Sequence, residues 1–180
     1  MATSSLRYLP LVLICVLSGC QQVQPEQEIV QNFLFEANYI ASGWGALYNG
    51  YYIDNLGGLY RFQYEAEDEP WKPQNSEQLT EAELQEKYAH NRTSLGTINL
   101  DKLSRMFQLI DEAAQGPYSA REFVMDDAGI TTLFGYRYET ETQAYIPVVL
   151  LVTGDYIERN LSDAGIELAQ WLVPLMGGSY

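Results

Sequence analysis

The strongest constraint on the fold comes from two aromatic segments that flank a turn sequence. Residues 51–53 and 59–64 are rich in tyrosine and phenylalanine, and residues 54–58 between them read Asp-Asn-Leu-Gly-Gly. Aromatic side chains favour strands, whereas Asn and Gly tolerate the positive φ angles of tight turns. The pattern therefore predicts an antiparallel hairpin, with alternate aromatic rings on one face of its second strand.

Alternating apolar residues predict further strands. Residues 33–40 alternate with period two, although residues 29–33 also fit the start of a helix, and strand is the preferred interpretation. A second meander is expected over residues 121–125, 131–139 and 146–152. Because residues 148–152 are apolar on both faces, they should form the most buried strand.

Helical signals occur at three places. Thr80 and Glu83 have the spacing of a capping box and predict a helix over residues 80–90. Apolar residues at helical spacing predict a second helix over residues 100–115. Ser162 is a suitable N-cap for a closing helix, whose sheet-facing positions would be Leu168, Ala169, Leu172 and Val173.

The order of these elements predicts an α+β domain rather than alternating βαβ units. We expect an antiparallel sheet of five or six strands, formed by two meanders, with two to three helices packed mainly on one face. The domain is expected to span residues 29–180.

The first twenty residues have a different character. A short polar start containing Arg7 precedes an apolar run over residues 8–17, which is shorter than the roughly 20 residues that a bilayer span requires. Small residues then lead into a cysteine, in the order Leu17-Ser18-Gly19-Cys20. This arrangement is typical of a secretory leader that is removed after export.

The four residues that end this leader match the lipobox of bacterial lipoproteins, so the chain resembles that family here. The resemblance implies cleavage before Cys20, attachment of a diacylglyceryl group to its thiol, and acylation, commonly by palmitate, of the new N-terminus. Residues 1–19 would be the signal peptide and residues 20–28 the lipidated cysteine with a polar tether. Gln21, rather than Asp, favours the outer membrane with the domain facing the periplasm. An ordinary secretory leader that contains a cysteine is the alternative.

The body of the chain also resembles bacterial lipoproteins with an aromatic Tyr-Ile-Asp hairpin and a final Trp-Leu helix. This second resemblance does not indicate which activity the chain has.

Net charge adds a separate limit on the partners: the chain carries 10 basic and 24 acidic residues. Loss of Arg7 with the leader leaves nine basic residues and a charge of −15, which disfavours nucleic acid and anionic lipid headgroups as partners. With Cys15 removed and Cys20 lipidated, no disulfide can form inside the domain.

The residues offer little for catalysis. His90 is the only histidine and stands at the expected end of a helix, where a cap is a simpler role than a base. With no free thiol and one imidazole, zinc is not expected, and no sequence has the pattern of a calcium loop. Acidic residues are so numerous that a glycosidase-like pair has no predictive value. We therefore predict no catalytic residue, cofactor or metal, and favour a protein that is not an enzyme.

Fourteen tyrosines are the most distinctive part of the composition. Most would be explained by a core and by cross-strand pairs, but an exposed stripe is the alternative. The possible binding face consists of Tyr60, Tyr64, Tyr136, Tyr138 and Trp71. The preferred function is a lipid-anchored envelope protein with a non-enzymatic role, binding an envelope protein or acting structurally. The alternative is a module that binds or hydrolyses peptidoglycan or polysaccharide, and charge alone suggests a weaker third hypothesis, inhibition of cationic lysozyme-like enzymes.

Overall fold

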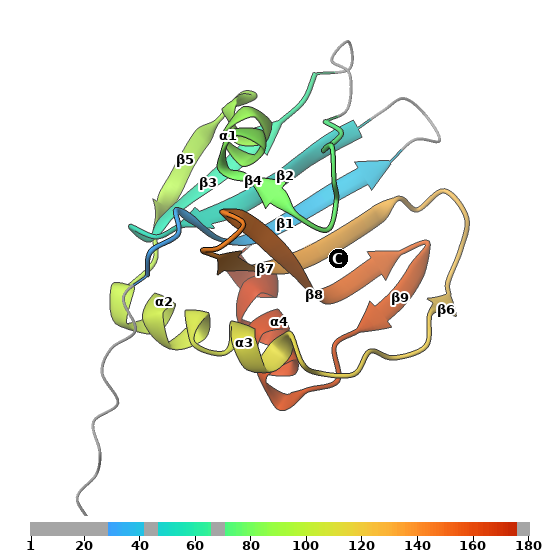
Figure 1. Ribbon diagram of the computed structural model, residues 1–180. Helices are drawn as coiled ribbons and strands as arrows, with labels where there is room; N and C mark the ends of the chain where they lie inside the picture. Colours follow the sequence, from blue (N-terminus) through green and yellow to red (C-terminus); the bar gives the residue numbers. More distant parts are fainter. Residues whose placement is uncertain (1–28, 42–46, 66–70, 176–180) are drawn as a thin grey trace, which may run out of the picture.

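The computed structural model describes residues 29–41, 47–65 and 71–175 (Figure 1). The predicted leader, Cys20 and the tether lie outside these residues. The elements in chain order are β1 (Phe33–Ala41), β2 (Leu47–Asp54), β3 (Gly58–Gln63), β4 (Leu79–Thr80), α1 (Glu81–Ala89), β5 (Thr93–Thr97), α2 (Leu100–Phe107), α3 (Ile110–Ala113), β6 (Glu122–Phe123), β7 (Ile130–Glu139), β8 (Ala144–Gly154), β9 (Tyr156–Arg159) and α4 (Asp163–Leu175).

One antiparallel sheet of nine strands organises the described residues. Its order is β5-β3-β2-β1-β7-β8-β9-β6, and β4 pairs with β8 off this path. The α+β class is confirmed, but the expected five or six strands are too few. The additional strands β4, β5 and β9 were missed because β4 has two residues, β5 is exposed throughout, and β9 has four residues without clear alternation.

The predicted β2–β3 hairpin is present, and its turn is stabilised locally. The Asp54 carboxylate accepts hydrogen bonds from the backbone N–H groups of Leu56 and Gly58. Gly57 has φ = 79°, a conformation that favours glycine. The turn sequence therefore determines where the two strands reverse.

The two faces of the sheet are covered differently. The segments α2, α3 and α4 pack on one face over a mainly aliphatic core, called here the aliphatic core, to which Leu103, Ile110, Leu133 and Leu168 belong together with Phe35. The opposite face carries an aromatic cluster with α1 above it (Figure 1). Helices were expected mainly on one face, and α1 departs from this because Leu84 and Tyr88 pack among the aromatic rings.

A bulge in β1 sets which side chains reach each face. The pairing of β1 with β2 shifts register between Phe33 and Phe35, so Phe33 joins the aromatic cluster and Phe35 joins the aliphatic core. Beyond the bulge, Glu36 faces the aromatic side and Ala37 the aliphatic side. The longest buried run lies here, over residues 33–38, rather than in residues 148–152, because β1 is central and covered on both faces.

The helix boundaries follow their capping residues. Thr80 and Glu83 form the predicted capping box of α1, and the Ser162 hydroxyl accepts a hydrogen bond from the Gly165 N–H at the start of α4. The single helix expected over residues 100–115 is instead α2 and α3, separated at Gln108 and Leu109. Within the described part of the chain, none of the helices is sufficiently long and apolar to span a bilayer.

Candidate functional site

A buried charged cluster lies between α1 and the centre of the sheet. It consists of Glu36 on β1, Lys87 and Tyr88 on α1, Tyr136 on β7, and Asn38, and we call it the Glu36 cluster. The side chains of Glu36 and Lys87 are 0% and 2% exposed. Charged side chains are rarely buried this completely unless they are paired. Glu36 therefore needs hydrogen-bonding partners inside the protein.

Five donated hydrogen bonds satisfy both oxygens of the Glu36 carboxylate. Lys87 Nζ lies 2.6 Å from Oε1 and 2.8 Å from Oε2. Asn38 Nδ2 donates to Oε1 at 2.8 Å, and Tyr136 Oη donates to Oε2 at 2.6 Å. Tyr88 Oη also donates to Oε2. This complete set of donors offsets much of the desolvation cost of burying the carboxylate.

Burial controls the protonation of the partners. It lowers the pKa of Lys87, and the Glu36 carboxylate opposes that shift by favouring the charged ammonium. Burial, together with the negative charge of Glu36, raises the pKa of Tyr88 and of Tyr136 well above its usual range. Both phenols consequently remain protonated donors. The Lys87 ammonium also lies 4.5 Å from the centre of the Trp71 ring, a cation–π distance.

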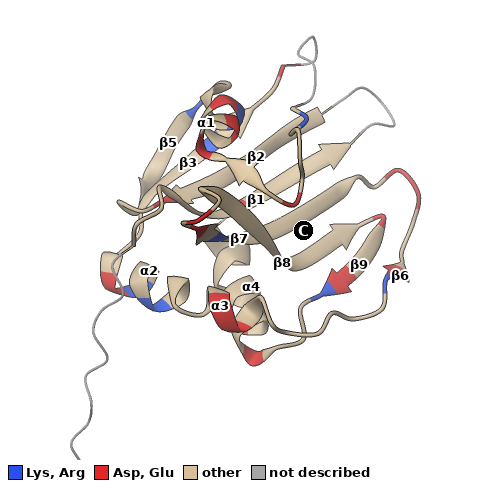
Figure 2. Ribbon diagram, viewed as in Figure 1, with Lys and Arg blue, Asp and Glu red and all other residues tan. Residues whose placement is uncertain are grey.

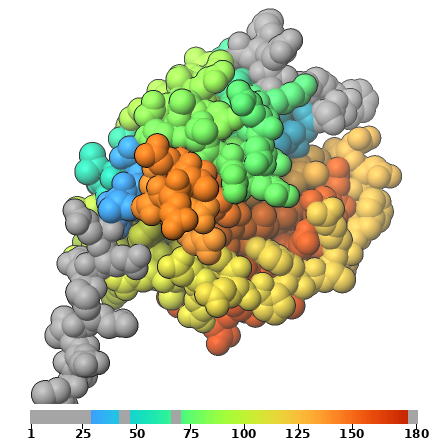
Figure 3. All heavy atoms as spheres, in the orientation of Figure 1, coloured from blue at the N-terminus to red at the C-terminus, as the bar shows by residue number. Residues whose placement is uncertain are grey.

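A pocket of about 580 Å³ adjoins this cluster. It lies on the aromatic-side face of β1, β7 and β8, beside the segment over residues 71–79, and Lys87 and Tyr136 form part of its wall. Most of the remaining wall is apolar and includes Ile40, Leu79, Phe134, Ile146, Pro147 and Val149. Its size is within the range of small-molecule sites. In Figure 3, the green segment that includes residues 71–90 packs beside the orange β7–β8 hairpin.

The chemistry of this pocket favours binding over proton transfer. Both oxygens of Glu36 already accept hydrogen bonds, and Lys87 is paired with that carboxylate. A general base must lie within hydrogen-bond reach of the substrate proton that it accepts. The Glu36 carboxylate instead accepts hydrogen bonds from side chains of the protein. The pocket thus offers apolar walls, the Trp71 ring and a charge-compensated end.

The five residues of the predicted binding face all belong to the aromatic cluster. Tyr64 and Tyr136 are buried within it, whereas Tyr60, Tyr138 and Trp71 are half-buried at its margin. Of the five, Trp71 and Tyr136 line the 580 Å³ pocket. The structure brings the residues together in a packed cluster instead of presenting all of them as an exposed stripe.

Sequence reasoning missed Glu36 and Lys87. A signal for Glu36 was available, because it is the only charged residue in the nine-residue strand β1. Lys87 follows Leu84 by three residues and precedes Tyr88, so it lies on the inward side of α1. Two residues of opposite charge at inward positions are consistent with a buried ion pair, but neither position shows which residue is the partner.

His90 lies where a cap was expected. It is the C-cap residue of α1, and its ring stacks on Tyr64 with 3.9 Å between the ring centres. Across residues 29–41, 47–65 and 71–175, no group of three or more His, Cys, Asp or Glu side chains is placed to hold a metal ion.

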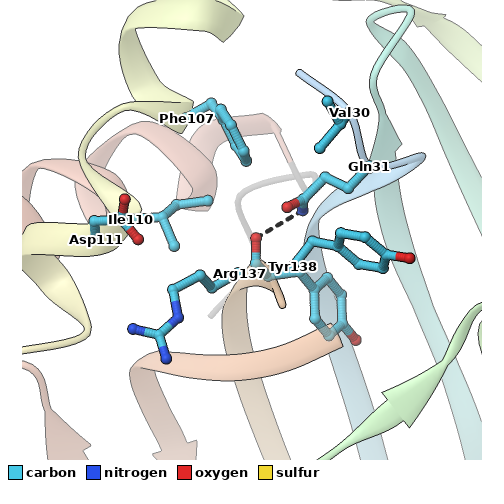
Figure 4. Close-up of a pocket in the computed structure, with 8 residues that line it drawn as sticks. Val30, Gln31, Phe107, Ile110, Asp111, Arg137 and Tyr138 are labelled. Carbon is cyan, nitrogen blue, oxygen red and sulfur yellow. Dashed lines mark hydrogen bonds between the residues drawn. The ribbon is translucent and has the colours of Figure 1, made fainter. Parts of the chain in front are cut away.

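A second, smaller pocket of about 170 Å³ lies where the described chain begins. Figure 4 shows Val30, Phe107, Ile110 and Arg137 around it. The Gln31 side chain donates to the backbone carbonyl oxygens of Phe33 and Tyr136, at 2.7 Å in each case. The bond to Tyr136 attaches the start of the domain to β7. The pocket is below the usual size range for a ligand site.

Comparison with protein-family models, with curated proteins and with solved structures finds no match to this chain. The site is defined by its geometry, as an apolar pocket beside a buried, hydrogen-bonded ion pair in an α+β protein.

Proposed function

We propose that this protein is a non-catalytic, lipid-anchored envelope protein, attached to the outer membrane through Cys20, whose pocket binds an apolar group of an envelope ligand. The lipobox-like residues 17–20 support the anchor. The observation that supports binding is the 580 Å³ pocket, whose wall is mostly apolar and whose Lys87 and Tyr136 side chains both donate hydrogen bonds to Glu36.

The ligand group is uncharged. Glu36 and Lys87 compensate each other at 2.6 Å, so neither carries an unpaired charge that would attract an ion. The apolar side chains and the Trp71 ring favour an aliphatic or aromatic group, whose burial is stabilised by roughly 25 cal/mol per Å² of apolar surface.

A neutral fluorescent probe tests this binding. N-phenyl-1-naphthylamine should give saturable fluorescence with the mature protein carrying Cys20→Ser. Ile40→Trp should weaken that binding at least tenfold, because Ile40 lines the pocket and is 46% exposed at its edge. Ile166→Trp is the matched control, since Ile166 is 42% exposed and lines a separate groove beside α4. Loss of binding in the Ile166 variant alone, or no saturable binding at all, contradicts the proposed pocket.

The anchor is tested separately by mass spectrometry of the protein purified from bacterial membranes. The expected N-terminal peptide starts at Cys20 and carries the mass of a diacylglyceryl group and an acyl chain. A free thiol at that residue, or cleavage elsewhere, contradicts the anchor.

Glycan binding is the second candidate, and the half-buried Trp71 ring and the exposed Glu77, which line the same pocket, favour it. An aromatic ring next to a carboxylate can stack on a sugar and accept a hydrogen bond from it. If the protein binds glycan here, it should sediment with peptidoglycan, and Trp71→Ala should abolish that co-sedimentation. Hydrolysis of the glycan by the same protein would contradict a non-catalytic role.

A further inference from the structure

Three exposed apolar side chains lie at the end of the domain where the N-terminal segment joins it. Val30, Leu56 and Leu100 are 67%, 78% and 57% exposed. They come from the start of the domain, the β2–β3 turn and the first residue of α2. A single exposed leucine is ordinary, but three at one end require a closer look.

Backbone hydrogen bonds connect these three segments. The Asn55 N–H donates to the Asn32 carbonyl at 3.0 Å, which attaches the turn to the start of the domain. The Ile98 N–H donates to the Gly57 carbonyl at 2.7 Å, which attaches the same turn to the residues before α2. Val30 and Phe107 of α2 line the 170 Å³ pocket. Figure 1 shows the β2–β3 turn, α2 and the segment that leads into β1 on the same side of the molecule.

Charge distinguishes this end from the rest of the chain. Lys102 and Arg105 lie on α2, visible in blue in Figure 2, and Arg137 borders the same pocket as Val30. The neighbouring acids are Asp54, Asp101, Asp111 and Glu81. Glu26 and Glu28, which precede Ile29 in the chain, bring the acids to six, so three cations against six acids give −3, whereas the rest of the mature chain carries six basic and 18 acidic residues, or −12. The repulsion expected between the whole chain and anionic lipid is therefore weakest here.

The length of the tether brings this end close to any membrane that holds Cys20. Nine residue steps separate Cys20 from Ile29, so the tether spans at most about 30 Å and on the order of 15–20 Å when it is flexible. The residues that follow the tether are therefore the part of the domain that always stays within this distance of Cys20.

We propose that the surface formed by Val30, Leu56 and Leu100, with the cations Lys102, Arg105 and Arg137, docks on the lipid bilayer. This proposal rests on the proposed lipid anchor. The apolar side chains enter the headgroup region while the cations contact lipid phosphates. Ile40 lies seven residues after Phe33 along β1, roughly 23 Å away from this end, so docking leaves the mouth of the 580 Å³ pocket open to solvent.

Site-specific fluorescence in the complete lipidated protein tests the docking surface. Cys15 is lost with the leader and Cys20 is acylated, so an introduced cysteine is the only reactive thiol. Leu56→Cys would carry an environment-sensitive nitrobenzoxadiazole label. Phe123→Cys is the matched control, because Phe123 is 67% exposed and lies on β6 at the far edge of the sheet.

The labelled proteins are reconstituted into phosphatidylethanolamine–phosphatidylglycerol vesicles that contain doxyl-labelled lipid. We expect the lipid to quench the label at residue 56 at least threefold more than the label at residue 123. Arg105→Glu with Arg137→Glu should reduce that difference at least twofold. Equal quenching at the two sites overturns the docking surface, as does a signal at residue 56 that depends on protein density and not on labelled lipid, which indicates contact between copies.

Flotation of the same vesicles separates the two proposals. Protein that fails to float with the vesicles contradicts the anchor itself. Protein that floats but shows no difference between the labels leaves the anchor intact and contradicts the docking surface.

Discussion

The two faces of the sheet bury apolar surface in different ways. Under α2, α3 and α4 the core is aliphatic, and its buried members include Leu103, Leu133 and Leu168. Under α1 the cluster is built from phenylalanine and tyrosine around the ion pair of Glu36 and Lys87. An aliphatic core gains stability from burial alone. A buried ion pair gains little net stability, but it penalises every packing in which a partner is missing.

This difference indicates separate roles for the two faces. The aliphatic face contributes stability through apolar burial alone. The aromatic face selects one position for α1, because only that position brings Lys87 within 2.6 Å of Glu36. The pocket is on the aromatic face, where Lys87 and Tyr136 form part of its wall. A precise pocket wall and a stable core are thus supported by different side chains.

Alkaline pH should produce the largest effect and should act through the aromatic face. Burial raises the pKa of Tyr88 and Tyr136, and it raises the pKa of Tyr52 to about 12. A raised folded pKa gives stability that is complete below the ordinary value near 10 and is lost as the pH rises above it. The loss is about 1.4 kcal/mol per pH unit for each phenol that cannot ionise while folded.

The lowered pKa of Lys87 acts in the opposite direction as the pH approaches 10.5, but one ammonium is outweighed by several phenols. Absorbance at 295 nm and circular dichroism should be followed together above pH 10. We expect the buried phenols to ionise in the same cooperative step that unfolds the protein. Ionisation of all tyrosines before any loss of structure would contradict this account.

Removal of one partner of the ion pair should have the next largest effect. Lys87→Met leaves the Glu36 carboxylate buried without its cation, and we expect a loss of about 3–5 kcal/mol in the free energy of unfolding. Adding Glu36→Gln removes the unpaired charge, so the double variant should lose less than the sum of the two single variants. Urea denaturation of all four proteins measures the coupling. Additive losses would show that the pair is not coupled.

A truncation on the aliphatic face should have a somewhat smaller effect of a different kind. Leu168 is fully buried, and Leu168→Ala should cost about 2–5 kcal/mol through lost burial and a residual cavity. The cost should be the same at pH 7 and pH 9, and probe binding in the other face's pocket should be retained at temperatures where the variant is folded. If Leu168→Ala abolished probe binding in the folded protein, the two faces would not be separable.

Local chemistry made part of this fold predictable. The β2–β3 hairpin follows from the Asp54–Gly58 turn, and α1 follows from the capping box of Thr80 and Glu83. Most tyrosines were expected in a core or in cross-strand pairs, and Tyr64 and Tyr136 are buried in the aromatic cluster while Tyr60 is half-buried at its margin. Which tyrosine stays at the margin was not predictable, because alternation shows that residues share a face and does not show what covers it.

Residues close together in the chain determine what the sequence decides alone: turn positions, helix caps, strand alternation and the excess of acidic side chains. Tertiary structure alone decided that a bulge turns Phe33 to the opposite face from Phe35, and that Glu36 meets Lys87, 51 residues later in the chain. Hydrogen-bonded turns and caps involve neighbours a few residues apart, so their partners are encoded locally. A buried ion pair and the pocket beside it exist only after α1 has packed across the sheet, and no local pattern specifies that position.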